Sequence, residues 1–247
     1  MAPPEQDHWK RAAAEAAARI VERNTVVGLG SGSTAALFVE ALGRRVAREN
    51  LSIICIPTSE RAAEQARRLK IPLTSLAGHT QIDVTVDGAD EVESGTLNLI
   101  KGHGGAALRE KIVASASNRL VIVADETKLV EHVGALVSVP VEVVQFGWQA
   151  TARHLEQMGT RPALRLRDGQ APFITDGGNY ILDCAFGPML NPSDIALKLD
   201  QTVGVVEHGL FLGIATQAFI GGRDGVKILK RNAKPGAPDS PRPTANS

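Results

Sequence analysis

Three short motifs contain most of the residues that could do chemistry in this chain of 247 residues. The first, Gly28–Thr34 (GLGSGST), follows a β-branched run and precedes a helical pattern. Its glycines let backbone amides approach an anion, and the amino end of a helix adds partial positive charge. The motif lacks the lysine of a Walker A loop, and Ser33 replaces the third glycine of a dinucleotide-binding motif. It indicates either a serine-capped tight turn or a cradle for a phosphate or carboxylate, and a monophosphate suits its low charge better than a nucleotide.

The second motif, Asp87–Glu91 (DGADE), places three carboxylates within five residues directly after the strand-like segment DVTV. In open α/β sheets, ligands bind at the carboxyl ends of the strands. Crowded carboxylates raise one another's pKa, which suits proton transfer. The alternative is an ordinary solvated Asp-Gly turn.

The third motif, Lys101–Gly105 (KGHGG), leads into a helical pattern that carries Glu110. Lys101 can pair with a phosphate or an oxyanion as a point charge. Glu110 shares a helical row with Ala106 and Val113, and this small, apolar flank can partly desolvate the carboxylate and raise its pKa toward that of a general base. The alternative is a solvated glutamate paired with the neighbouring arginine and lysine.

Lys128, in ADETKLV, follows another buried strand pattern, so we expect it at the same sheet edge; a surface lysine is the alternative. The six histidines and the two cysteines, Cys55 and Cys184, show no metal-ligand spacing, so we expect no metal site. Both cysteines lie in apolar stretches, which predicts buried thiols.

The elements that must position these motifs follow from hydrophobic patterning. Strands alternate with helices up to about His132, which predicts βαβ units and a mostly parallel sheet. IPLTSL, at 71–76, is predicted as a further short strand. Beyond His132, the order strand, helix, strand, strand, helix, strand predicts a small α+β unit with an antiparallel sheet. Within it, TDGGN at 175–179, between FI and YILD, predicts a hairpin turn.

Composition excludes several classes of protein. Lys plus Arg equals Asp plus Glu at 27 each, so the chain lacks the basic excess that drives binding to nucleic acid or an anionic membrane. No apolar run approaches the ~18 residues of a spanning helix, and no apolar signal core is present at the start. We therefore expect a soluble protein of a reducing compartment. The proline-rich end lacks large apolar residues and is expected to be disordered.

Taken together, these segments resemble the ribose-5-phosphate isomerase family, type A. The matching stretches occur in family order from about Lys10 to Lys230: VGLGSGSTA, IPTS, DVTVDGADE, NLIKGHGGAALREKIVA, VIVADETKLV, PVEVV, LDC and GVVEHGLF. Two departures concern the shape of one loop. His103 stands where the family often has glycine or another variable residue, and Ala107-Leu108 stands where Leu-Thr is common.

The resemblance implies an α/β fold: a Rossmann-like, mostly parallel sheet with helices on both faces, plus a small inserted α+β (ferredoxin-like) domain. We expect the catalytic domain over residues 1–133 and 207–232. The small domain is expected over 134–206, and a disordered proline-rich tail over 233–247.

The resemblance also implies reversible isomerisation of D-ribose 5-phosphate to D-ribulose 5-phosphate through an enediolate, in the non-oxidative pentose phosphate pathway, without metal or organic cofactor. Glu110 would move the proton between C1 and C2, Asp87 would assist ring opening and hydroxyl proton transfer, and Lys101 would stabilise the enediolate oxygen. Lys10 and Lys128 would meet the phosphate. The full set of expected substrate-binding residues is Lys10, Gly30, Ser31, Gly32, Ser33, Thr34, Asp87, Gly88, Ala89, Asp90, Lys101, Gly102, His103, Gly104, Gly105 and Lys128.

The family further implies a cytoplasmic homodimer or homotetramer that binds a small sugar phosphate, and neither nucleic acid nor membrane. Two alternatives stay open. A non-catalytic sugar-phosphate sensor on the same fold would lack the paired Glu110 and Lys101. A related sugar-phosphate deaminase or CoA-transferase would share the fold, but the combination of DGADE with KGHGG and REK argues against it.

Overall fold

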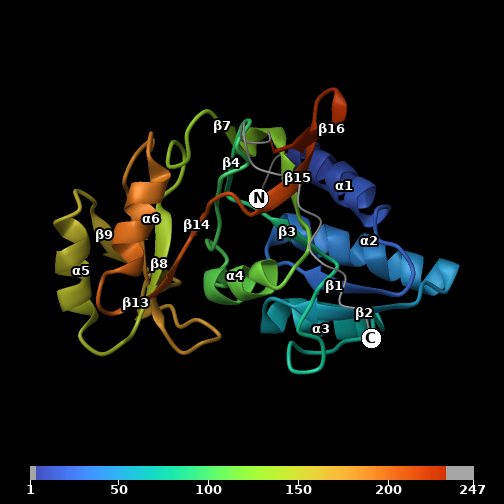
Figure 1. Ribbon diagram of the computed structural model, residues 1–247, viewed down its shortest axis with the longest axis horizontal. Helices are drawn as coiled ribbons and strands as arrows, with labels where there is room; N and C mark the ends of the chain where they lie inside the picture. Colours follow the sequence, from blue (N-terminus) through green and yellow to red (C-terminus); the bar gives the residue numbers. More distant parts are fainter. Residues whose placement is uncertain (1–3, 232–247) are drawn as a thin grey trace, which may run out of the picture.

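The computed structural model describes residues 4–231 and contains a larger α/β part beside a smaller α+β part (Figure 1). The central sheet of the larger part has six strands in the order β16-β15-β6-β3-β1-β2, and all neighbours are parallel except β15 and β16. Its strands are β1 (Thr25–Leu29), β2 (Ile53–Pro57), β3 (Val84–Gly88), β6 (Leu120–Asp125), β15 (Ala215–Gly222) and β16 (Gly225–Lys230). The predicted parallel sheet is confirmed.

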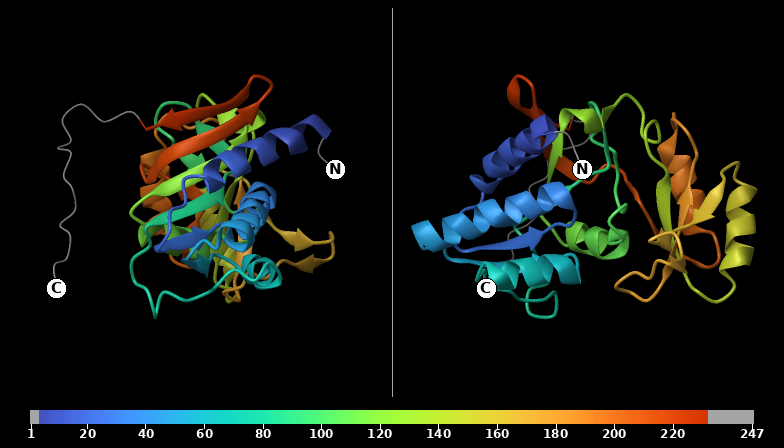
Figure 2. Two further views of the ribbon diagram at one scale, coloured as in Figure 1. Left: turned by 90° about the vertical axis from the view of Figure 1, so that its right-hand side faces the viewer. Right: turned by 180° about the vertical axis from the view of Figure 1, so that it is seen from behind.

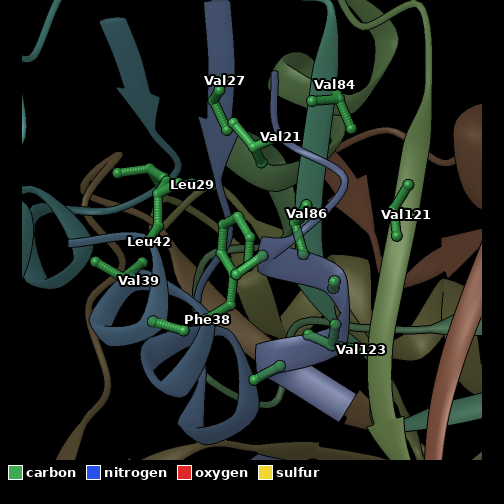
Figure 3. Packing of buried hydrophobic residues seen from close by; sticks show 14 of the residues in the cluster. Val21, Val27, Leu29, Phe38, Val39, Leu42, Val84, Val86, Val121 and Val123 are labelled. Carbon is green, nitrogen blue, oxygen red and sulfur yellow. The ribbon is translucent and has the colours of Figure 1, made fainter. Parts of the chain in front are cut away.

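Helices cover both faces of this sheet. The helices are α1 (Pro4–Ala18), α2 (Ser33–Glu49), α3 (Glu60–Arg68) and α4 (Ala107–Ser115). Side chains of α1, α2 and α3 share one apolar core with the strands, and Phe38 of α2 lies in this core together with Val27, Val86 and Val123 (Figure 3). Figure 2 shows α1 and α2 on the same side of the sheet. On the opposite face, Val113 of α4 packs against Ile56 and Ile82.

A second, small sheet with the order β14-β5-β4-β7 lies against the same face as α4. It consists of β4 (Glu91–Glu93), β5 (Leu99–Ile100), β7 (Leu129–Val130) and β14 (Leu210–Phe211), and a 3-10 helix, η1 (Glu126–Lys128), precedes β7. Its residues share a buried core with the side chains of β6 and β15 that point away from α1 and α2. The strands have only two or three residues each, too few for a periodic pattern.

The smaller part is an antiparallel sheet with the order β13-β8-β12-β9, and its two helices share one core with it. Its elements are β8 (Val139–Val143), α5 (Trp148–Glu156), β9 (Pro162–Leu164), β12 (Tyr180–Cys184), α6 (Pro192–Asp200) and β13 (Val205–His208). A two-stranded hairpin, β10 (Leu166–Arg167) with β11 (Ala171–Pro172), is inserted before β12. The predicted order of strands and helices is confirmed.

Two local predictions are wrong. In the segment 71–76 only Leu73 pairs, through a single bridge to Cys55, so IPLTSL forms no strand. TDGGN does form a turn, closed by a hydrogen bond from Thr175 N–H to the Asn179 carbonyl, but the two residues before it are not a strand. β12 pairs with β8 and β9 instead, and the chain before the turn lies beside the end of β9, where Phe173 N–H donates to the Arg165 carbonyl.

The segment GVVEHGLF divides between the two parts of the molecule. β13 joins the smaller sheet and β14 joins β5, with Gly209 between them. A Cβ at Gly209 would lie 2.2 Å from the Lys101 carbonyl oxygen, so only glycine fits where these backbones cross. The expected disordered tail, 233–247, lies outside the described residues.

Both cysteines are free and buried, as predicted, and burial raises the pKa of each thiol to about 12. Among residues 4–231, no helix has the length and apolar character needed to cross a membrane.

Candidate active site

A cavity of about 110 Å³ opens at the carboxyl edge of the central sheet, where the loops after β1, β3 and β5 meet α1, α4 and η1. Every residue of its wall belongs to the set expected from the sequence. They are Lys10, Ser31, Gly32, Ser33, Thr34, Gly88, Ala89, Asp90, Lys101, Gly102, Gly104, Glu110 and Lys128. The crossover topology therefore brings the separate motifs to one place.

Four expected residues lie elsewhere. Gly30 and Gly105 line an adjoining cavity that shares Ser31, Gly32 and Gly104 with the first. Asp87 is buried beneath the wall, with 1% of its surface exposed. His103 turns away from the cavity, because its Nε2 lies 3.0 Å from the Ser138 carbonyl oxygen.

The first motif forms an open helix start. Gly32 has φ +93° and precedes α2 without a side-chain cap, so the first amides of this helix are left to a ligand or solvent. A Cβ at Gly30 would lie 2.1 Å from Asp87 Oδ1, so glycine is required for the carboxylate to approach the loop. Thr34 is largely buried, whereas Ser33 is exposed. The arrangement suits a bound anion.

The Ser31 hydroxyl is held by two residues that follow β2. It lies 2.7 Å from Thr58 Oγ1 and 2.7 Å from Ser59 Oγ. Ser59 also caps α3 by accepting a hydrogen bond from Ala62 N–H. Ser31 is thus fixed in the wall by polar partners that sequence patterning did not assign to the site.

Asp87, Lys101 and Glu110 form a buried group at the floor of the cavity. Lys101 Nζ lies 2.9 Å from Asp87 Oδ2 and 3.3 Å from Glu110 Oε2. It also donates a hydrogen bond to the Gly88 carbonyl at 2.6 Å. Asp87 Oδ1 accepts from the amides of Ser31 and Gly88 at 2.9 and 2.7 Å. One cation is therefore shared between two carboxylates out of contact with bulk solvent.

Burial and the neighbouring charges change the proton affinities of this group. Desolvation, helped by the charge of Asp87, raises the pKa of Glu110 to about 8, although Lys101 opposes the shift. Burial also raises the pKa of Asp87 against the effect of Lys101. Burial disfavours the ammonium of Lys101, but Asp87 and Glu110 outweigh it and raise its pKa. Glu110 can therefore both take up and release a proton near neutral pH, as a general base must.

The three carboxylates of DGADE are separated rather than crowded together. Asp90 lines the cavity and accepts a hydrogen bond from His103 N–H at 3.1 Å. Glu91 points away and accepts from the amides of Gly134, Leu136 and Val137. The prediction of three crowded carboxylates is wrong for Glu91, because strand β4 begins at this residue and the amides at 134–137 bind its carboxylate.

Lys10 and Lys128 bring two positive charges to the same wall from distant parts of the chain. Gln6, one turn before Lys10 on α1, donates to Thr127 Oγ1 at 2.9 Å and so ties α1 to η1. Two lysines beside the open start of α2 make this end of the cavity suitable for a phosphate dianion.

Phe211, whose ring lies near the ammonium groups of Lys101 and Lys111, was not predicted from the sequence. Its buried ring centroid lies 5.5 Å from Lys101 Nζ and 4.9 Å from Lys111 Nζ, within the range of a cation–π interaction. The only sequence sign was its place at the end of GVVEHGLF.

Within residues 4–231, one cluster has ligand atoms close enough together to hold a cation: Asp200, Glu207 and His208. Lys111 Nζ already lies 2.5 Å from Glu207 Oε1 and 3.5 Å from His208 Nδ1. Burial, helped by Lys111, lowers the pKa of His208 to about 4. The cluster lies outside the cavity wall, and the ammonium group of Lys111 already provides a positive charge beside it.

Comparison with known proteins gives consistent matches. The family model described as ribose 5-phosphate isomerase A (phosphoriboisomerase A) matches residues 54–225. The chain is 52% identical to ribose-5-phosphate isomerase A of Synechococcus sp. (strain JA-3-3Ab) over 226 residues, which are 92% of this chain and 98% of that protein. The corresponding protein of Gloeobacter violaceus is also 52% identical, over 93% of this chain and 99% of its own length.

Solved structures agree with these matches. Ribose 5-phosphate isomerase A from Methanocaldococcus jannaschii is 39% identical and superposes with a TM-score of 0.87, covering 91% of this chain and 99% of that one. A D-ribose-5-phosphate isomerase in complex with phospho-erythronic acid is 39% identical with a TM-score of 0.88, covering 92% of this chain and 99% of that one.

Proposed function

Because the chain belongs to the ribose 5-phosphate isomerase A family, we propose that Asp87, Lys101 and Glu110 perform the chemistry of that family here. The protein is an aldose–ketose isomerase that interconverts ribose 5-phosphate and ribulose 5-phosphate, a step of the non-oxidative pentose phosphate pathway. The observation that carries the proposal is the buried Lys101 shared between two carboxylates, one of which has a pKa near 8.

The phosphate anchors the substrate at the end of the cavity formed by Lys10, Lys128 and the amides at the start of α2. A related structure contains phospho-erythronic acid, a phosphorylated sugar acid, which fits a site of this kind. Binding energy from the phosphate holds C1 and C2 against Glu110 and Lys101 without itself reacting.

Ring opening requires a proton at the ring oxygen and loss of a proton from the C1 hydroxyl, as the C1–ring oxygen bond breaks. Lys101 lines the cavity and donates the first proton, and the proton of the C1 hydroxyl, relayed through Asp90, restores the Lys101 ammonium, which Asp87 Oδ2 stabilises from 2.9 Å. Because Asp87 is 1% exposed, its effect on the sugar passes through Lys101. Asp90, in the wall, accepts the hydroxyl proton.

In the isomerisation step, the Glu110 carboxylate removes the proton from C2. The electron pair of that bond forms the C1–C2 double bond, and the former carbonyl oxygen O1 becomes an enediolate oxygen beside the Lys101 ammonium. The proton of the C2 hydroxyl passes to O1 as Glu110 returns its proton to C1, which leaves a ketone at C2. A fixed cation in a water-poor site stabilises such a charge more strongly than solvent does.

We propose that the reaction needs no metal ion or organic cofactor, because Lys101 and the start of α4 supply positive charge where the enediolate forms. Purified protein incubated with ribose 5-phosphate should produce ketose. A sugar-phosphate sensor on this fold would bind the same compound and leave it unchanged, so absence of ketose despite binding would contradict the proposal.

We further propose that residues 134–206 form an inserted domain and that the protein is a cytoplasmic homodimer or homotetramer. Large apolar side chains are exposed on the smaller part, among them Phe146 at 95%, Val203 at 83% and Leu190 at 79%, which supports self-association. Sedimentation equilibrium of the full chain tests this, and a monomer at micromolar concentration would contradict it.

A further inference from the structure

The loop between Lys101 and α4 is held by an arginine from the smaller part of the molecule. Arg165 lies between β9 and β10, and its Nη1 donates hydrogen bonds to the carbonyls of Gly102 and His103, both at 3.0 Å. Its Nε donates to Asp183 Oδ2 at 2.9 Å, and its Nη2 donates to the other oxygen of the same carboxylate. This bidentate pair fixes the plane of the guanidinium, so its remaining donors have one direction.

The larger part of the molecule also holds this loop. His103 N–H donates to Asp90 Oδ2 at 3.1 Å, so the two peptide groups that flank His103 bind Asp90 and Arg165. Gly105 has φ +83°, and a Cβ there would lie 2.4 Å from the ring of Phe173. Aromatic packing from the smaller part therefore closes the end of the turn that Arg165 holds at its start.

This turn determines how Lys101 and Glu110 face each other. Lys101 precedes it, Glu110 follows on the first turn of α4, and Gly102 and Gly104 line the cavity between them. The hydrogen bonds and the ion pair of Arg165 go to Asp183, Gly102 and His103, and not to the three residues that do the chemistry. A displacement of the turn would change the 3.3 Å separation of Lys101 Nζ and Glu110 Oε2, and errors near 1 Å in such geometry cost about 100-fold in rate.

We propose that Arg165 is a positioning residue for the isomerisation: its guanidinium, oriented by Asp183, holds the Gly102–Gly105 turn so that Glu110 and Lys101 meet the substrate in register. This deepens the proposed function, on which it rests. The phosphate end of the cavity is formed by other elements, so the loss of Arg165 affects the chemical step and leaves phosphate binding nearly intact.

The test compares Arg165→Met and Arg165→Lys with Arg161→Met, a control at an exposed arginine of the same part. We expect Arg165→Met to lower kcat by about 10- to 100-fold with KM for ribose 5-phosphate within about threefold. Arg165→Lys retains the positive charge but lacks the planar guanidinium that binds Asp183 and the two carbonyls together, so its kcat should lie between those of Arg165→Met and wild type. Arg161→Met should match wild type.

Chemical rescue separates positioning from general destabilisation. Arg165→Ala should regain part of its kcat when millimolar guanidinium chloride is added, whereas equal sodium chloride should not restore it. Asp183→Asn should lower kcat in the same direction, with a smaller effect. Urea unfolding and far-UV circular dichroism identify the variants that are folded, and kcat is compared among those.

The proposal is overturned if a folded Arg165→Met or Arg165→Ala variant keeps kcat within twofold of wild type, or if the loss is entirely in KM. Glu110→Gln is assayed in parallel. If Glu110→Gln is inactive while the Arg165 variants are normal, only the role of Arg165 fails. If Glu110→Gln is also normal, the proposed function of the site fails.

Discussion

Replacing Glu110 with glutamine should make the folded protein more stable at alkaline pH while making it a poor enzyme. The folded protein favours the protonated carboxyl, since burial raises the pKa of Glu110 from its ordinary value of 4.5 to about 8. The resulting stability is present below pH 4.5 and is lost as the pH rises to about 8 and above, where the buried carboxyl must ionise. Glutamine has a similar shape and cannot ionise.

The magnitude follows from this shift. At about 1.4 kcal/mol per pH unit, the gap between 4.5 and about 8 corresponds to about 5 kcal/mol above pH 9. Lys101 lies 3.3 Å away and relaxation of the site offsets part of that cost, so we expect Glu110→Gln to gain about 2–5 kcal/mol at pH 9 and little at pH 5.

Urea unfolding of wild type and Glu110→Gln at pH 5, 7 and 9 measures this difference. Glu64→Gln, at an exposed position on α3, is the matched control and should show no comparable pH-dependent gain. If the difference between Glu110→Gln and wild type were the same at all three pH values, Glu110 would not be held in the protonated form, and a pKa near 8 would be contradicted.

Three other outcomes follow from the site. The kcat/KM of the wild type should rise as the pH increases through about 8, since Glu110 must be ionised to accept the C2 proton; a rate–pH profile that is flat between pH 6 and 9 would contradict a Glu110 pKa near 8. Lys128→Ala should raise KM for ribose 5-phosphate by about 10-fold or more with a small change in kcat, and free ribose should be a poor substrate of the wild type; an unchanged KM would remove Lys128 from the phosphate site. Activity should survive dialysis against a chelator, and a loss restored by a divalent ion would require Asp90 to be reconsidered as a ligand.

Residue types and their order along the chain predicted most of the cavity wall, and Lys10 was expected only from the family resemblance. The motifs follow strands of a parallel sheet, and such a sheet brings its carboxyl ends together, so Gly32, Lys101, Glu110 and Lys128 could be placed in one site from the sequence. The raised proton affinity of Glu110 was likewise predictable from the small residues in its helical row.

Side-chain direction and long-range pairing could not be predicted in the same way. Glu91 belongs to a three-residue strand, too short to reveal its face, and turns its carboxylate to the amides at 134–137 instead of the site. The strand predicted at 71–76 has the right residue types but only one pairing partner. Arg165 and Phe211 act from segments more than 50 residues away from Lys101, and no local pattern indicates such a contact.

The most direct test of the catalytic role of Glu110 follows the proton itself. Wild-type enzyme in deuterium oxide should introduce deuterium at C1 of ribulose 5-phosphate and, through the reverse reaction, at C2 of ribose 5-phosphate, as measured by proton NMR. Glu110→Gln should lower kcat by about 10²–10⁴ and lose this exchange in parallel, while phospho-erythronic acid should bind it with nearly unchanged affinity. If Glu110→Gln kept near-normal turnover and exchange while Asp87→Asn or Asp90→Asn abolished them, the base would lie in the DGADE turn and Glu110 would not be the residue that moves the proton.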